Sequence, residues 1–232
     1  MAQKSGLGSA LRRMMGGAPP SGRDIGPAAE SVLMNDTRLR IFCSICNRPG
    51  SHVRELSRAA GVAPPSVLWH AGRLAGRGAV VRSRSGNRSV FCPAGMVEAG
   101  DIGLLAFIGE RSRLPAVRLA MERPGMAQSE LTRGAGVNGH ALGALASRGV
   151  LSVVRDGRHR RYYPAPLLAQ KRELYEKRAR RFRQKLLSLF QEEGLSPEEQ
   201  RYDRTFLEVR VTLGTRTESL RLLCNPFALE KF

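Results

Sequence analysis

The chain has 232 residues, of which 42% are hydrophobic, so it is long enough to bury one or two cores. Its 38 Lys and Arg residues against 20 Asp and Glu residues give a formal charge of +18, which favours nucleic acid as a partner, with an anionic membrane surface as the rival. No apolar run approaches the roughly 20 residues of a spanning helix, and the N-terminus lacks the continuous apolar segment of a signal peptide, so we expect a cytoplasmic protein with no membrane partner.

Residues 1–30 repeat Gly, Ser, Pro and Ala and are predicted to form a flexible basic tail. The first domain is predicted at residues 31–96 and begins with a helix that Asn35 or Asp36 can cap. The apolar face of this helix is marked by a spacing of three and four residues at Leu39, Phe42, Cys43 and Cys46. Pro49-Gly50 is expected to end it.

Two more helices and two strands complete the predicted first domain, at residues 52–60, 64–76 or 64–78, 79–84 and 89–93. Gly61 can adopt the left-handed geometry that ends a helix, and Pro64 is tolerated in a first helical turn. The turn Ser85-Gly86-Asn87 joins the strands into a hairpin with basic residues at its tip. Three helices followed by a basic hairpin predict a winged helix-turn-helix.

The third predicted helix separates into two faces. Val67, Ala71 and Leu74 lie within one inward arc. The predicted DNA-reading residues lie outside that arc and are Pro65, Ser66, Trp69 and Arg73. An arginine can present a bidentate pair of donors to guanine. In the alternative interpretation, Trp69 packs on the wing and Arg73 is only solvated. His70, beside the inward arc, is predicted to be a packed, hydrogen-bonded core residue.

The segment from Arg38 to Val62 is repeated from Arg113 to Val137, at a constant offset of 75 residues. After a contraction of four residues the similarity resumes at an offset of 71 residues, so residues 97–166 are predicted to be a second winged helix-turn-helix. A repeat array is the alternative, but two copies fit tandem domains better. The contraction removes one turn from the second recognition helix, so we expect poor base readout by this copy.

Basic and polar residues bracket the glycine turn of both predicted hairpins. On the first hairpin they are Arg82, Arg84, Asn87 and Arg88, and on the second Arg155, Arg158, His159, Arg160 and Arg161. Alternate side chains of a strand face opposite sides, so only part of each group can meet one phosphate backbone. The remaining residues are expected to be solvated. A wholly solvated charged surface is the competing interpretation.

Residues 167–194 are predicted to form a long basic helix. Leu168, Tyr175, Phe182 and Leu189 recur every seven residues, which favours pairing with a second copy in a homodimer. The same residues could instead pack on the winged modules of one chain. Residues 195–232 are predicted to contain a β-hairpin, because apolar and polar residues alternate up to the turn at Gly214 and a second strand follows it.

The four cysteines do not predict a metal site or a redox site. Cys43 and Cys46 form a CxxC pair within a predicted helix, and neither a second pair nor two histidines follow at the spacing of a zinc site. Reduced, packed thiols are expected. The sequence also lacks a phosphate-binding glycine loop, a nucleophile elbow and paired acidic clusters. We therefore predict no enzyme activity, no metal and no cofactor.

An ordered set of motifs resembles archaeal winged-helix regulators related to the ArsR and MarR families. The set covers about 65 residues, recurs weakly in the second copy, and comprises Asn35-Asp36-Thr37-Arg38-Leu39-Arg40-Ile41, Arg54-Glu55-Leu56-Ser57-Arg58-Ala59-Ala60-Gly61-Val62, Val67-Leu68-Trp69-His70, Arg73-Leu74 and the wing. The resemblance implies a transcription regulator that binds specific double-stranded DNA, with the third helix in the major groove. The chain departs from the pattern at Ala71-Gly72, where that glycine lowers helix stability by about 1 kcal/mol relative to alanine.

The expected fold is α+β, mainly α, with two tandem winged modules, a long helix and a C-terminal hairpin. The charge and the short second reading helix favour another function, an abundant, chromatin-like, nucleoid-associated protein with low sequence specificity. The intact first reading helix favours a regulator. Nothing in the sequence identifies a small-molecule effector.

Overall fold

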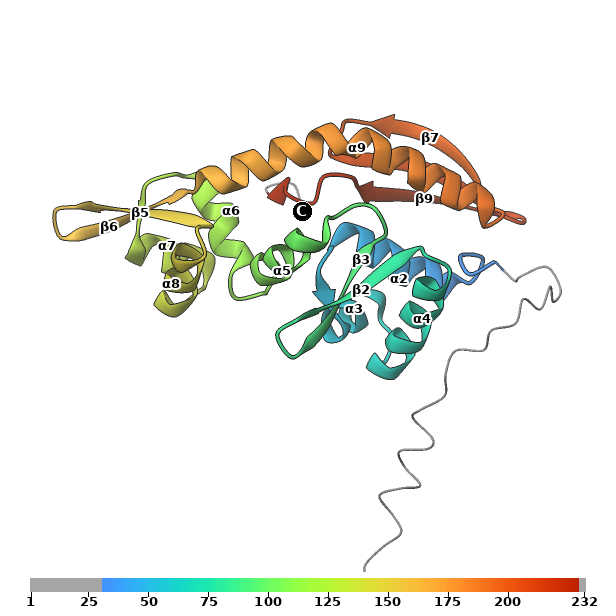
Figure 1. Cartoon of the computed structure of the whole chain (residues 1–232), viewed down its shortest axis with the longest axis horizontal. Helices are drawn as coiled ribbons and strands as arrows, with labels where there is room; N and C mark the ends of the chain where they lie inside the picture. Colours follow the sequence, from blue (N-terminus) through green and yellow to red (C-terminus); the bar gives the residue numbers. More distant parts are fainter. Residues whose placement is uncertain (1–30, 230–232) are drawn as a thin grey trace, which may run out of the picture. The chain divides into compact units, whose positions relative to one another are not determined.

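A computed structural model describes residues 31–229, and the predicted tail at residues 1–30 lies outside them. Within the described part the chain has eight helices and three antiparallel sheets of three strands each, which confirms the predicted α+β class (Figure 1). None of the helices in residues 31–229 combines the length and the apolar character needed to span a bilayer.

The first set of elements has the winged helix-turn-helix order. It consists of α2 (Asp36–Asn47), β1 (Ser51–His52), α3 (Val53–Ala60), α4 (Pro64–Gly76), β2 (Val80–Ser85) and β3 (Arg88–Pro93). The Asn35 side chain accepts a hydrogen bond from the backbone N–H of Arg38 at 3.0 Å, which confirms its predicted capping role. Gly61 ends α3 with a φ of 65°, as predicted. The short strand β1 pairs with β3 and was not predicted.

The second set of elements repeats this order after one additional helix. Its elements are α5 (Ala99–Ile108), α6 (Leu114–Glu122), β4 (Met126–Ala127), α7 (Gln128–Ala135), α8 (Gly139–Ser147), β5 (Leu151–Asp156) and β6 (His159–Pro164). The strand orders correspond, β1-β3-β2 in the first sheet and β4-β6-β5 in the second. α8 has 9 residues and α4 has 13, which confirms the predicted shortening of the second reading helix.

The long helix α9 (Pro166–Glu192) contributes to both hydrophobic cores. Phe182 and Leu186 pack in the core of the first set and the C-terminal sheet, whereas Leu168 and Tyr175 pack in the core of the second set. Each of these four side chains is at most 3% exposed. The predicted dimer seam of Leu168, Tyr175, Phe182 and Leu189 is therefore wrong, because the first three are buried within the chain and Leu189 packs against the first core. Heptad spacing marks an apolar helix face and does not say what covers it.

The C-terminal segment is a three-stranded sheet, so the predicted two-stranded hairpin was incomplete. Its strands are β7 (Ser196–Tyr202), β8 (Phe206–Leu213) and β9 (Arg216–Leu223), in the order β7-β8-β9. Strand β7 is an edge strand with exposed residues and one proline, so it lacks the apolar alternation that marks a strand. Leu207, Val209 and Leu222 from this sheet share a core with α2 and α9.

Candidate nucleic-acid interface

Helix α4 has one buried face and one exposed face. Val67, Ala71 and Leu74 are 0% exposed, as the sequence predicted. The four predicted reading residues on this helix are all exposed, namely Pro65, Ser66, Trp69 and Arg73. Leu68, which the sequence analysis did not single out, is also 43% exposed. The exposed face therefore combines a hydroxyl and a guanidinium group with two large apolar side chains.

Trp69 is 58% exposed and contacts residues of its own helix. Its ring centre lies 4.8 Å from that of His70, and the guanidinium carbon of Arg73 lies 6.0 Å from the ring centre of Trp69. The alternative in which Trp69 packs on the wing has no support in these contacts. A tryptophan and an arginine held side by side present both an apolar surface and a cation to a groove or a phosphate backbone.

His70 is half-buried beneath the reading face. Its Nδ1 atom is buried and has no hydrogen-bond partner among the described residues, so the prediction of a hydrogen-bonded core histidine is wrong in that respect. The buried residue beside it is Arg38, which can only donate, and the Nε atom of Arg38 also has no partner in residues 31–229. Burial and the charge of Arg38 lower the pKa of His70, which favours the neutral ring.

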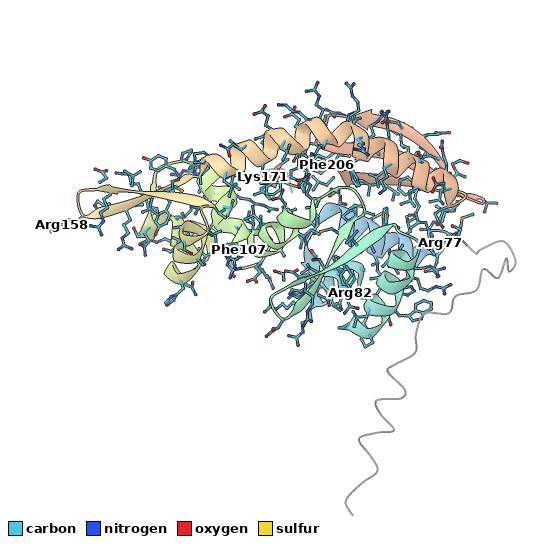
Figure 2. The ribbon with its side chains drawn as sticks, in the orientation of Figure 1. Arg77, Arg82, Phe107, Arg158, Lys171 and Phe206 are labelled. Atoms are coloured by element: carbon cyan, nitrogen blue, oxygen red, sulfur yellow. The ribbon has the colours of Figure 1, made fainter. Side chains whose placement is uncertain are left out.

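The first wing carries some arginines that have partners within the chain and one that is exposed without a partner among the described residues. Arg82 donates from Nε and Nη2 to the Ser89 hydroxyl at 3.1 and 2.8 Å, and Arg88 lies 3.7 Å from the Glu110 carboxylate. Arg84 and Asn87 are exposed near the hairpin tip (Figure 2 labels Arg82 on this hairpin). The hairpin thus presents a cation and an amide outward, while two arginines already have partners within the chain.

The second wing likewise has one arginine with partners within the chain and others that are exposed. Arg161 pairs with Asp156 at 2.6 Å and donates to the Gly125 carbonyl at 3.0 Å. The hydrogen bond from Arg161, followed by its charge, lowers the pKa of Asp156. Arg155 and Arg158 remain exposed, and Figure 2 shows Arg158 at the hairpin end.

A recess lies between the second wing and α7. It has a volume of about 340 Å³ and is lined by Ala127, Gln128, Ser129, Thr132, Arg158, His159 and Arg160. Three predicted wing residues therefore meet at one place. The amide and hydroxyl groups of α7 in this recess were not predicted. No local sequence signal identifies them, because their place beside the hairpin depends on how α7 packs against the second wing.

The reading helix of the second set offers fewer groups. Residues 139–147 include Gly139 and Gly143 among the exposed positions, and the Asn138 side chain accepts from the Ala141 N–H at 2.9 Å. The side chain of Asn138 is thus used for capping. His140 is the largest exposed side chain of α8. Poor base readout by this helix stays a prediction.

Three of the four cysteines, Cys46, Cys92 and Cys224, are buried, and Cys43 is half-buried. Cys43 and Cys46 lie on α2, as predicted, and residues 31–229 contain no group of three or more side chains that could hold a metal ion. Burial raises the pKa of the Cys43 thiol to about 12. Burial also raises the pKa of the Cys92 and Cys224 thiols to about 12.

Comparison with known proteins agrees with the geometry of the first set. Residues 34–81 match the family model for winged helix-turn-helix DNA-binding domains, so this part of the chain is a winged helix-turn-helix domain. Over 84 residues the chain is 34% identical to an uncharacterized HTH-type transcriptional regulator of Methanocaldococcus jannaschii. The aligned part is 36% of this chain and 21% of the relative, so the chain spans about a fifth of the length of that protein.

Proposed function

We propose that this protein is a transcription regulator that binds double-stranded DNA through its first winged helix-turn-helix domain. The observation that carries the proposal is the division of α4, where Val67, Ala71 and Leu74 are fully buried while Ser66, Trp69 and Arg73 are exposed. A helix held in this way can lie in the major groove with its outer side chains on base edges. The exposed Arg84 on the adjacent wing supplies a cation for phosphate.

We further propose that the second set of elements is a tandem winged module that mainly binds phosphate. Its wing carries exposed arginines, whereas its reading helix is one turn shorter and carries few long polar side chains. In this view residues 31–96 read the sequence and residues 97–166 position the duplex, since phosphate contacts fix register and carry no sequence information. The homodimer expected from the heptad pattern is not part of the proposal, because that stripe is buried.

The test compares Arg73→Ala with Arg160→Ala on two DNA duplexes, one a site selected from a random library and the other its scrambled sequence. Arg73→Ala should lower affinity for the selected site about tenfold or more, since a bidentate base contact contributes about 1–3 kcal/mol of discrimination. Its effect on the scrambled duplex should be small. Arg160→Ala should weaken binding to both duplexes by similar factors. Equal losses on both duplexes for Arg73→Ala would remove this residue from base readout.

A second candidate function is an architectural, nucleoid-associated protein with low sequence preference. The charge of +18 and the short α8 favour it, because a strongly basic chain binds DNA largely through phosphate. Genome-wide mapping of bound sites in cells separates the two candidates. A small number of sharp sites supports a regulator, whereas broad occupancy supports the architectural role.

A further inference from the structure

An open cavity of about 640 Å³ lies between the first set of elements and the start of the second, and no residue of α4 lines it. The carboxyl end of α2 and the middle of α3 form one side, and the α5–α6 loop with the start of α6 forms the other. Its volume falls within the range of about 300–1,000 Å³ typical of small-molecule sites. Neither the DNA-binding proposal nor the family resemblance uses this cavity.

Four arginines from four different elements line the cavity. Arg48 caps α2, Arg58 lies on α3, Arg111 lies in the α5–α6 loop and Arg118 lies on α6. Arg118 is half-buried, and its Nε atom donates to the Leu229 carbonyl at 3.1 Å, which fixes its position. Burial, followed by the charge of Arg48, lowers the pKa of Arg118. Like charges are therefore gathered around one cavity.

The one carboxylate in the cavity wall is used elsewhere. The Glu55 Oε2 atom accepts from the His52 N–H at 3.0 Å and lies 3.9 Å from His52 Nε2, as part of the N-terminal cap of α3. Within residues 31–229, no ion pair joins Arg48, Arg58 or Arg111 to a carboxylate. These three guanidinium groups are free to donate to a ligand.

The start of α6 adds a further favourable feature. Leu114 and Pro115 from its first turn line the cavity, and that turn contains no acidic residue. The amino end of a helix carries a partial positive charge that favours anions. The carboxyl end of α2 also borders the cavity, and the Arg48 side chain offsets its partial negative charge.

We propose that this cavity binds an organic phosphate of about nucleotide size. Guanidinium groups donate to phosphate or carboxylate oxygens in bidentate pairs. A planar carboxylate is satisfied by one or two such groups, whereas three arginines without a carboxylate partner in residues 31–229 that approach from separate elements suit the tetrahedral oxygens of a phosphate. Leu114 and Pro115 provide apolar surface for the remainder of the ligand. The proposal does not depend on DNA binding by the chain.

The test is calorimetric titration of the full-length protein with ADP at fixed ionic strength, with adenosine and citrate as comparison ligands. The variant carries Arg48→Gln and Arg111→Gln, both at exposed positions outside the cores. Its matched control carries Arg181→Gln and Arg201→Gln, which lower the charge equally at two exposed positions that do not line the cavity. ADP should bind the wild type with one-to-one stoichiometry and adenosine should not bind. The Arg48/Arg111 variant should bind ADP at least about tenfold more weakly, while the control should be unchanged.

Any of four results would overturn the proposal. Three of them are an absence of ADP binding to the wild type, an equal loss of ADP affinity in both double variants, and tighter binding of citrate than of ADP. A fourth is loss of DNA affinity in the Arg48/Arg111 variant without any binding of ADP to the wild type, which would assign these arginines to the DNA surface. Failure of the DNA proposal would leave the ADP titration unaffected, so the two outcomes can be distinguished.

Discussion

At the scale of single residues, the arginines of this chain differ in how much of their charge is available to DNA. Arg161 is paired with Asp156 and with a backbone carbonyl, and Arg82 donates to Ser89. Arg84 and Arg158 are exposed. The sequence could identify all of these residues as wing cations, but it could not separate them, because cross-strand pairing depends on register.

This difference predicts distinct salt dependences of DNA binding. Arg158→Ala should flatten the slope of log affinity against log salt by about 0.9, the value expected for one lost phosphate contact on duplex DNA. The double variant Asp156→Ala/Arg161→Ala removes a pair with no net charge and should leave the slope nearly unchanged. Fluorescence anisotropy with one duplex at several salt concentrations measures both. An unchanged slope for Arg158→Ala would place this residue off the DNA.

The cysteines give a second prediction at this scale. Burial raises the pKa of Cys92 and Cys224 from 9.0 to about 12, so at pH 8 each thiolate is about a thousandfold scarcer than in an unfolded chain. Because the thiolate is the nucleophile, iodoacetamide should modify these residues about a thousandfold more slowly in the native protein than in urea. Mass spectrometry of timed samples measures the rates. Equal rates in both conditions would show that the thiols are accessible.

At the scale of elements, the helices with strong boundary residues were predictable. Asn35, Gly61 and Pro64 mark the ends of α2, α3 and α4 within about one residue of their observed positions. Strands β1 and β4 have two residues each and exist because they pair with β3 and β6, so no local pattern identifies them. Which residues face the recess between the second wing and α7 depends on packing between elements, and the spacing of residues within one element does not reveal it.

The end of α9 forms a clasp that the sequence did not predict. The buried Glu193 carboxylate accepts from the backbone N–H groups of Val32 and Leu33, and Arg77 at the end of α4 lies 3.5 Å from it. The clasp joins the start of the described chain to both the long helix and the reading helix. Glu193 and the two backbone donors are about 160 residues apart in sequence, so local analysis cannot detect their contact.

Glu193→Ala should therefore lower the free energy of unfolding by about 2–4 kcal/mol, because two buried backbone donors lose their acceptor. Glu192→Ala, at the exposed neighbouring position, should change it by less than about 0.5 kcal/mol. Urea unfolding followed by circular dichroism measures both variants. Similar midpoints would show that the clasp contributes little to stability.

At the scale of the whole molecule, the apolar stripe of α9 decides whether the long helix is a core element or a dimer seam. Phe182→Glu places a charge where the side chain is 3% exposed and should unfold the first core, since loss of a buried aromatic alone costs about 3–5 kcal/mol. Arg181→Glu, at the adjacent exposed position, should remain folded. Circular dichroism and light scattering provide the readouts. A folded Phe182→Glu variant with half the wild-type mass would restore the dimer seam.

The position of α9 in both cores also limits how the length of the chain can change. Tyr175 packs in the second core, and Ala179, one turn later, packs in the first. One residue inserted between them would rotate one half of the helix by about 100° relative to the other and shift it by about 1.5 Å, so only one core could keep its contacts. The wing tips at Gly86 and Gly157 carry no such constraint, because both glycines lie in open turns. Length variation among related chains should therefore accumulate at the hairpins and be absent from the middle of α9.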